Sequence, residues 1–276
     1  MGSMKSLLSE FKRPFPLLLM NKSQPSLLIP ALPMILFAMA APSSVGAQDR
    51  IIVQPRRVVV LRSGKAVRDF PERKRASVRY PIVRGLSDAA VLRRIQNTLT
   101  MKNVFDHTLE EFPRNPGLLS YDYKVNHNQN YLLDITFTEE SEGAYPDTGT
   151  KHFLINLKNG KVIRAADAFN PNSLNALAGL VDKKLKPEVA ELIKVNEDDK
   201  SSDAEAKSWV RDELKKLRIG VQNLDEFSVS DKGVTFLFDA GFPHAIQALQ
   251  PAGEYCFSYA ELRPYIKRDG PLGVFK

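Results

Sequence analysis

The chain lacks a second cysteine: Cys256 is alone, so an intrachain disulfide is excluded. Since cysteine is among the residue types most often buried, we expect Cys256 to be buried and inert. The sequence also has no G-x-S-x-G, G-x-G-x-x-G, Walker A or H-E-x-x-H motif, and no internal repeat or low-complexity tract. We therefore expect a protein with no catalytic residue, no cofactor and no metal.

Basic and acidic residues are nearly balanced in the part of the chain that we expect to fold. The first 47 residues hold four basic residues and one acidic residue, and without them the formal net charge falls from +7 to about +4. This charge is too mild to predict nucleic acid as a partner. It still permits a modest affinity for anionic surfaces.

The apolar run over residues 27–41 has 15 residues, which is short for a membrane span. Basic residues precede it, and the small residues Val45 and Ala47 follow at the positions that a signal peptidase reads. We interpret residues 1–47 as an export signal cleaved after Ala47, which predicts a periplasmic or extracellular protein with no stable membrane span. The alternative is an uncleaved anchor.

Residues 48–75 form a basic segment before the main domain. The apolar stretches 51–53 and 58–61 could pair as strands. The alternative is a solvated lead-in, because runs of like charge are usually solvated. We place the start of the folded module at residue 76.

Residues 76–276 have the pattern of a single α+β domain, with an antiparallel sheet packed against several helices. Tight turns join several neighbouring strands, and strands and helices are segregated along the chain. We predict strands over 78–82, 120–126, 131–138, 153–157, 227–230, 233–239 and 254–259, and helices over 87–111, 173–194 and 202–217.

Individual residues refine this prediction. Ser87 is a good N-cap for the first helix, and Pro187 should interrupt the second. In the third helix we expect Trp209 to face inward, with Gly220 as its C-cap. The pair Asn159-Gly160 predicts a hairpin with a type I′ turn, in which both central residues have positive φ.

Four segments carry a resemblance to a known family. They are Tyr80-Pro81 with Gly85 and the following helix, Gly143-Ala-Tyr-Pro146 with the strand and Asn-Gly turn after it, Asp167-Ala-Phe169, and the stretch 257–266. Together they resemble the domain of unknown function shared by the extracellular part of RsiV-type anti-sigma factors and the N-terminal half of PdaC-type peptidoglycan deacetylases. The chain departs from that pattern over residues 241–253, where a longer stretch replaces a short turn.

The resemblance implies a non-catalytic module of the cell envelope. In the anti-sigma factors such a domain senses lysozyme by binding it, and in the deacetylases it lies beside the catalytic domain. The implied partner is a lysozyme-like protein or peptidoglycan.

The acidic residues around Tyr145 are the main candidate binding site. Glu139, Glu140, Glu142 and Asp147 flank this aromatic residue in a segment that contains glycine and proline. They could form a rim that meets a basic protein, with Tyr145 as an aromatic anchor. The alternatives are a solvated loop, an inward-packed Tyr145, or paired carboxylates that act as in glycosidases.

Two further groups are weaker candidates. Phe242 and His244 lie in a stretch with Gly241 and Pro243, which forms either an exposed binding loop or a packed turn. His107 could share a helix face with Glu110 or Glu111 as a metal pair, but two ligands do not make a site, and a solvated helix surface is the favoured explanation of the spacing. His152 precedes an apolar strand, which favours a structural imidazole.

Two functional hypotheses follow. The first is a secreted binding or sensing module for an envelope ligand. The second is a cell-wall hydrolase or deacetylase-associated enzyme that uses the acidic cluster Glu140, Glu142 and Asp147. A hydrolase requires convergent carboxylates in a cleft and a raised pKa. A binding module is expected to show an exposed apolar or aromatic patch with an acidic rim.

Overall fold

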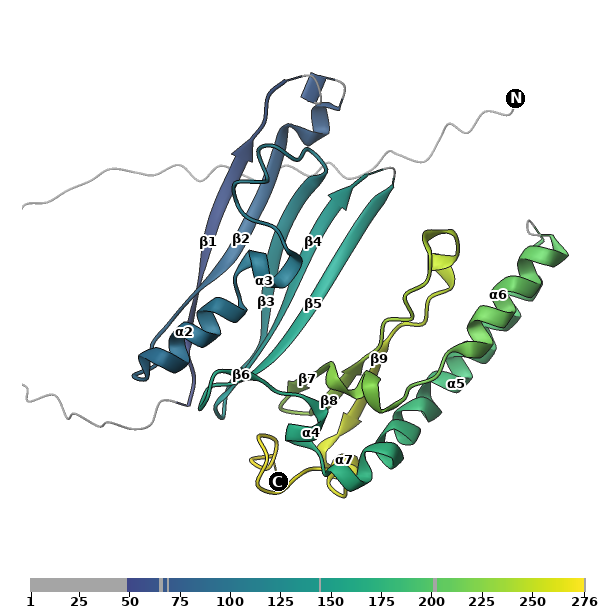
Figure 1. Ribbon diagram of the computed structural model, residues 1–276. Helices are drawn as coiled ribbons and strands as arrows, with labels where there is room; N and C mark the ends of the chain where they lie inside the picture. Colours follow the sequence, from purple (N-terminus) through teal and green to yellow (C-terminus); the bar gives the residue numbers. More distant parts are fainter. Residues whose placement is uncertain (1–48, 65–66, 69, 144, 201–202, 276) are drawn as a thin grey trace, which may run out of the picture. The chain divides into compact units, whose positions relative to one another are not determined.

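The computed structural model describes residues 49–64, 67–68, 70–143, 145–200 and 203–275 (Figure 1). The expected export signal and its cleavage site at Ala47 lie outside these residues. The strands of the first sheet are β1 (Ile52–Leu61), β2 (Arg75–Arg84), β3 (Leu118–Gln129), β4 (Leu132–Glu142), β5 (Pro146–Asn156) and β6 (Lys161–Val162). Those of the second sheet are β7 (Phe227–Ser230), β8 (Gly233–Leu237) and β9 (Glu254–Ser258).

The helices differ in length. The longer ones are α2 (Ala89–Thr98), α3 (Met101–Phe105), α5 (Leu174–Asp198) and α6 (Ala204–Lys216), and the single-turn helices are α4 (Ala165–Ala168) and α7 (Tyr259–Leu262). Short 3-10 helices are η1 (Pro71–Lys74), η2 (Pro171–Ser173), η3 (Val221–Asp225) and η4 (His244–Leu249).

The first sheet follows the chain order, β1 to β6. Its neighbouring strands are antiparallel except β2 and β3, which pair in parallel over only two residues. Parallel neighbours require a crossover, and α2 and α3 supply it on one face of the sheet (Figure 1). The second sheet has the order β7-β8-β9 and is wholly antiparallel. The predicted α+β class with antiparallel sheet and packed helices is thus confirmed.

Strand β1 lies inside the segment that the sequence set apart as a lead-in. It pairs with β2 along its full length, from Ile52 opposite Arg84 to Leu61 opposite Arg75. The buried Arg62 then fixes the end of the strand, because its guanidinium donates to the carbonyl oxygens of Phe112, Arg73 and Leu118. The sheet therefore begins at residue 52, and the boundary at 76 falls within a strand pair.

Two hairpin turns differ from the predicted pattern. The type I′ signature of two successive positive φ angles occurs at Asn130 and Tyr131, between Gln129 and Leu132, with φ values of 55° and 61°. At the predicted site the hairpin exists, but four residues separate the paired Asn156 and Lys161. Among these four, Gly160 alone has a positive φ, of 70°.

The helix boundaries correct several expectations. Asp88, and not Ser87, caps α2, because its carboxylate accepts from the backbone N–H groups of Ala90 and Val91. The expected helix to residue 111 is divided into α2 and α3, and Thr100 caps α3. Gly220 does not end α6, since it precedes η3 with a negative φ of −99°.

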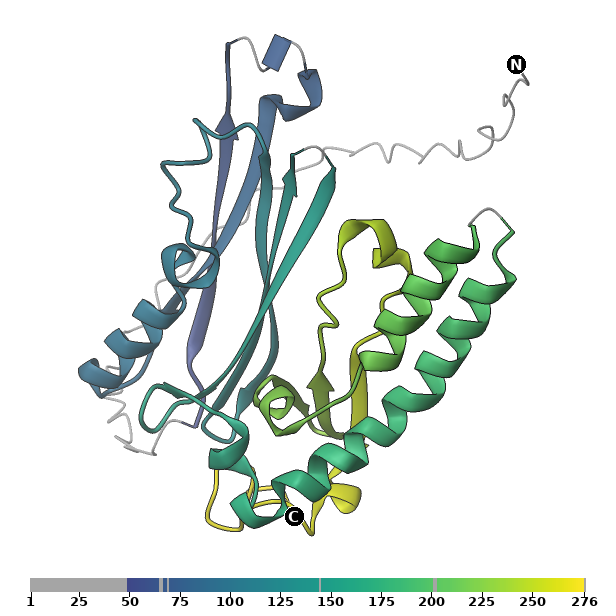
Figure 2. The same ribbon diagram turned by 45° about the vertical axis from the view of Figure 1, so that its right-hand side comes forward.

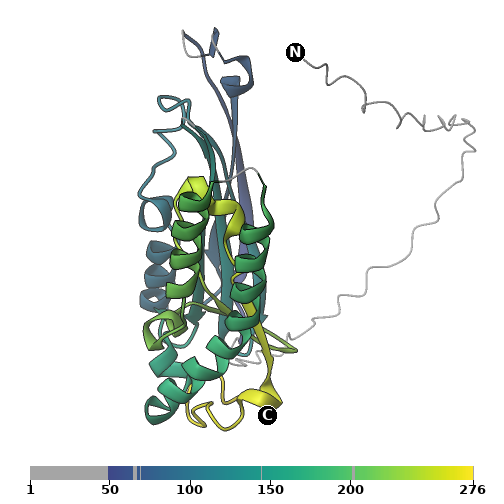
Figure 3. The same cartoon turned by 90° about the vertical axis from the view of Figure 1, so that its right-hand side faces the viewer.

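Helices α5 and α6 run side by side (Figures 2 and 3). Pro187 lies inside α5 without ending it, so the predicted interruption is wrong. Apolar residues on both sides of Pro187, such as Leu185 and Val189, belong to the packed interior, and this packing holds the helix together across the proline. Trp209 on α6 is exposed, whereas its neighbour Val210 is buried, so the inward prediction for Trp209 is also wrong.

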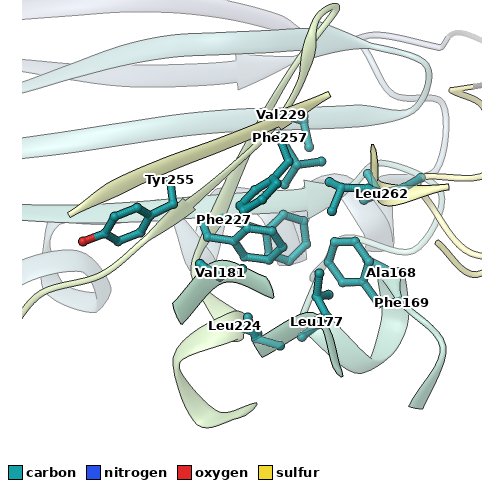
Figure 4. Packing of buried hydrophobic residues seen from close by; sticks show 14 of the residues in the cluster. Ala168, Phe169, Leu177, Val181, Leu224, Phe227, Val229, Tyr255, Phe257 and Leu262 are labelled. Carbon is teal, nitrogen blue, oxygen red and sulfur yellow. The ribbon is translucent and has the colours of Figure 1, made fainter. Parts of the chain in front are cut away.

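Two main apolar cores use opposite faces of β4 and β5. One core contains Leu133, Ile135 and Ile155 and packs under α2 and α3. The other contains Leu132 and Leu154 together with the second sheet and α5. Figure 4 shows its centre, where the rings of Phe169, Phe227 and Phe257 lie among aliphatic side chains. This alternation in β4 decides which polar residues face which surroundings.

Cys256 is exposed, which corrects the expected burial. It lies on β9 between the buried Tyr255 and Phe257, so its side chain points to the opposite face of that sheet. Its sulfur lies 3.2 Å from the hydroxyl of Thr235, its neighbour across the strand pair.

Within the described ranges, no helix combines the length and apolarity that a membrane crossing requires.

Candidate ligand-binding surface

The acidic residues of the predicted site belong to a strand pair and not to an irregular loop. Glu140 and Glu142 lie in β4, and Asp147 lies in β5. Directly opposed residues of antiparallel strands share a face. Asp147 is opposite Ser141, whereas Glu140 and Glu142 are opposite Thr148 and Pro146. The strand pair therefore sends Asp147 to one face of the sheet and the two glutamates to the other.

Glu140 borders a polar cleft of about 620 Å³. The cleft lies on the sheet around the short contact of β2 with β3, where only Ser77 and Val78 pair with Ser120 and Tyr121. Its lining comes from four strands and consists of Arg57, Ser77, Arg79, Ser120, Tyr121, Asp122, Tyr123, Lys124, Thr138 and Glu140.

Three cations and two carboxylates line this cleft, and both carboxylates already have partners. Arg79 binds Asp122 and also donates to the carbonyl oxygen of Tyr123. Glu140 accepts a 2.7 Å hydrogen bond from the hydroxyl of Ser120. Arg57 and Lys124 form no ion pair within the described part of the chain. The cleft can thus offer two cations and several hydroxyl groups to a ligand.

At the end of β4, Glu142 lies on the same face of the sheet as Glu140. Glu142 lies 3.3 Å from a guanidinium nitrogen of Arg73 in η1. The guanidinium of Arg73 also lies over the ring of the exposed Phe70, 4.3 Å from its centre. Tyr145 is 63% exposed at the turn. Sequence reasoning missed Phe70 and Arg73, because they lie about 70 residues before the turn that they approach.

Phe242 and His244 belong to a different part of the fold. They lie in the long connection between β8 and β9, and η4 begins at His244, whose side chain lies outside the description. Phe242 is half-buried and packs in a small apolar cluster with Val210 and Leu214 of α6. The longer stretch at 241–253 thus serves to cover α6, and Phe242 is a packed residue.

A buried carboxylate, Glu139, lies on the helix-covered face. One of its oxygens is 3.4 Å from Nε2 of His107, while Nδ1 of His107 is 3.2 Å from Glu111. Burial raises the pKa of Glu139, the nearby His107 lowers it, and the Glu111 carboxylate raises it. The other oxygen of Glu139 and the hydroxyl of Tyr121, its cross-strand neighbour, have no hydrogen-bond partner among the described residues.

This cluster corrects the expectation for His107. It precedes Glu111 in a turn and not on a helix, and its second neighbour is Glu139 rather than Glu110. The signal for Glu139 was present in the sequence, since it continues the alternation of Leu133, Ile135 and Phe137. In the described part of the chain, no group of three or more histidine, cysteine or acidic side chains is arranged to hold a metal ion.

Asp134 joins the two sheets. It is fully buried in β4 and accepts hydrogen bonds from the hydroxyl of Ser228 at 2.8 Å and the backbone N–H of Val229 at 2.6 Å, both in β7. Its other oxygen accepts from Asn126 and lies 2.7 Å from Nε2 of His152. His152 is thus a partnered, buried imidazole, as the sequence predicted.

Comparison with known proteins shows the fold and no more. No family model matches the sequence, and neither does any curated protein. A structure of a DUF3298 family protein from Pseudomonas aeruginosa is similar over 80% of this chain and 97% of its own, with a TM-score of 0.52 and 14% identity. A member of the same family from Bacteroides fragilis is similar over 82% and 96%, with a TM-score of 0.52 and 12% identity.

The chain therefore has the fold of DUF3298 family structures, which represent a domain of unknown function. This finding agrees with the expected class of uncharacterised domain.

Proposed function

We propose that the protein is an exported, non-catalytic binding module of the cell envelope, and that its ligand is a carboxylate-bearing glycan such as peptidoglycan. The observation that carries the proposal is the polar cleft across β1 to β4, in which Arg57 and Lys124 have no acidic partner within the described residues. The proposed address comes from residues 1–47 and the proposed class from the resemblance.

The lining of the cleft suits such a ligand chemically. A guanidinium group binds a carboxylate through two parallel hydrogen bonds, and an ammonium group adds a point charge. The hydroxyl groups of Ser77 and Thr138 and the carboxylates of Asp122 and Glu140 can exchange hydrogen bonds with sugar hydroxyl groups. Peptidoglycan supplies both carboxylates and sugar hydroxyl groups.

A lysozyme-like protein is the second candidate, and the exposed Tyr145 favours it. An aromatic side chain at a strand-pair turn can enter a pocket of a partner at little conformational cost. Glu142, next to the turn, supplies the negative charge that a basic protein requires. Arg73 already neutralises part of that charge, so the aromatic contact is the larger contribution in this proposal.

The hydrolase hypothesis has less support from the geometry. Its three carboxylates do not converge, because Asp147 lies on the opposite face of the sheet from Glu140 and Glu142. Of these two, Glu142 is already paired with Arg73, and Glu140 accepts a hydrogen bond from Ser120.

A binding assay with two separate probes tests these proposals. The full chain is incubated with insoluble peptidoglycan, and separately with immobilised lysozyme, and the bound fraction is measured. The variants are Arg57→Ala with Lys124→Ala in the cleft, and Tyr145→Ala at the turn. Lys215→Ala with Arg218→Ala removes the same charge from an exposed site near the end of α6 and serves as the control.

We expect the cleft variant to lose at least about tenfold in affinity for peptidoglycan, which corresponds to about 1.4 kcal/mol, while the control binds as the parent does. Equal binding by the parent, cleft variant and control would show that the cleft is not the site. Lysozyme capture that only Tyr145→Ala abolishes would favour the protein partner. Release of soluble wall fragments by the folded chain would favour the hydrolase.

A further inference from the structure

Strand β1 is an edge of the six-stranded sheet. It pairs with β2 on one side, and no described strand pairs with it on the other. An edge strand presents unpaired N–H and C=O groups to a potential partner. The register against β2 decides which of these groups point outward.

One backbone hydrogen bond at the end of β1 fixes this register. The N–H of Arg62 donates to the carbonyl oxygen of Lys74 at 2.9 Å, which makes this pair a hydrogen-bonded one. Hydrogen-bonded and non-hydrogen-bonded pairs alternate along antiparallel strands. The even-numbered residues of β1 therefore bond to β2, and the backbone groups of odd-numbered residues point away from it.

The two prolines of this strand pair support the same assignment. Pro55 lies directly opposite Pro81. Neither residue has an N–H group, so the pair fits only a non-hydrogen-bonded position without loss of ladder bonds. Residue 55 is odd, in agreement with the bond at Arg62.

The two halves of the edge differ. In the first half, Pro55 removes an outward N–H, which is one of the devices that block strand addition. In the second half, Arg57, Val59 and Leu61 all retain outward N–H and C=O groups. The side chains of Val59 and Leu61 are also 57% and 66% exposed. This half, residues 57–61, thus has a free hydrogen-bonding edge beside exposed apolar side chains.

The charges around residues 57–61 indicate which kind of segment would bind at this edge. Arg57 is opposite Arg79, and Leu61 is opposite the exposed Arg75. Directly opposed residues share a face, so these arginines flank Val59 and Leu61. Arg79 is already paired with Asp122, so Arg57 and Arg75 carry the charge that an acidic segment would complement, whereas a second copy of β1 would bring more arginines to the same place.

We propose that residues 57–61 accept an extended, acidic segment of a partner protein as an added strand. Backbone hydrogen bonds at residues 57, 59 and 61 provide affinity, and alternating apolar and acidic side chains of the segment contact Val59, Leu61 and the arginines. Arg57 also lines the proposed glycan cleft, but the backbone hydrogen bonds of this contact come from the strand edge and not from the floor of the cleft.

The probe is an acetylated, amidated hexapeptide of alternating valine and glutamate, compared with the same peptide carrying lysine in place of glutamate. It is titrated against the full chain, and backbone amide exchange is followed by NMR. We expect the glutamate peptide to slow exchange at residues 57, 59 and 61. We expect binding to the lysine peptide to be at least about tenfold weaker, as for a loss of about 1.4 kcal/mol.

Two variants of one position separate the backbone from the side chain. Val59→Pro removes an outward N–H and no hydrogen bond to β2. We expect this variant to fold, because Pro55 already occupies an equivalent position in the same strand. It should bind the glutamate peptide at least tenfold more weakly than the parent, again about 1.4 kcal/mol. Val59→Thr keeps the N–H and should keep binding. If Val59→Pro does not fold, the amide exchange of the parent still shows whether the peptide pairs with residues 57, 59 and 61.

The proposal is overturned if the peptide leaves the amides of 57, 59 and 61 unprotected, if both peptides bind equally, or if folded Val59→Pro binds as Val59→Thr does. It is also overturned if the free chain is a dimer in which these three amides are already protected. In that case a second copy occupies the edge.

Discussion

Strand β4 contributes different kinds of residues to the two faces of the six-stranded sheet. On the helix-covered face, β4 presents Leu133, Ile135 and Phe137, and then Glu139. On the other face, its last residues are polar and Glu140 borders the cleft. Adjacent glutamates therefore differ in chemistry: burial raises the pKa of Glu139, whereas Glu140 is exposed and bonded to Ser120. The face of a residue, more than its type, decides what it can do.

The largest effect should distinguish a buried carboxylate from an exposed one. Asp134→Ala leaves Ser228, the N–H of Val229 and His152 without their common partner in the interior. We expect it to lower the free energy of unfolding by about 3–5 kcal/mol. Asp122→Ala, which breaks an exposed pair with Arg79, should cost at most about 1 kcal/mol. Urea unfolding of both variants measures the difference.

Similar losses for Asp134→Ala and Asp122→Ala would show that Asp134 does not join the sheets as described. Asp134→Asn adds a finer comparison, because it keeps the shape and one acceptor oxygen. We expect its loss to lie between those of the two alanine variants.

The next effect concerns the tight contact of a turn with the covering helix. Gly160 has a φ of 70°, and a Cβ atom there would lie 2.9 Å from the carbonyl oxygen of Val91 in α2. Gly160→Val should cost at least about 1–3 kcal/mol, the usual cost of a non-glycine residue in a strained conformation. Gly143→Val is the control, since nothing lies within 4 Å of a Cβ atom there and its φ is not positive. Thermal melting compares them.

Equal melting temperatures for Gly160→Val and Gly143→Val would contradict the contact between the turn and α2. Gly160→Ala has the same strain in φ and brings the same Cβ atom against Val91, so its difference from Gly160→Val measures the two additional methyl groups of valine alone.

The sequence predicted the strands better than their surroundings. Alternation located the strand that starts near Tyr131, but its end at Glu142 was missed because Gly143 and Pro146 suggest a loop. Pairing with β5 over eleven positions keeps the polar end of β4 extended, and pairing is not visible in one segment alone. Likewise, the helix across Pro187 is maintained by packing on both sides of the proline.

The candidate site was predicted only in part. Glu140, Glu142 and Tyr145 do lie on or beside one surface, but the register that sends Asp147 to the other face depends on the turn between the strands. The partners Arg73, Ser120 and Lys124 come from other strands or helices, and no spacing along the chain relates them to Glu140.

A smaller effect tests the buried carboxylate itself. Since the pKa of Glu139 is raised in the folded state, the folded chain binds a proton at this carboxylate more tightly than the unfolded chain does. The stabilising effect of the protonated carboxyl is present below its ordinary pKa of about 4.3, and is lost as the pH rises through the raised folded value. Glu139→Gln should therefore unfold at a higher temperature than the parent at pH 7.

The difference between Glu139→Gln and the parent should vanish below about pH 4, where both side chains are neutral. Glu140→Gln on the open face is the matched control and should change stability little at either pH. A parent that is more stable than Glu139→Gln at pH 7 would show that the contact with His107 outweighs burial.

The smallest effect extends the comparison of faces to the second sheet. In β9, Tyr255 and Phe257 are buried and Cys256 is exposed between them, with its sulfur beside the hydroxyl of Thr235. A thiol reagent should therefore label Cys256 in the folded chain at a rate close to that in denaturant. Cys256→Ser should change the free energy of unfolding by less than about 0.5 kcal/mol, as surface substitutions usually do. Phe257→Ser, one residue away on the covered face, should cost about 3–5 kcal/mol, because it removes a buried aromatic ring. Protection of the thiol until the chain unfolds would instead restore the burial that the sequence predicted, and it would mean that another segment or molecule covers this face of the second sheet.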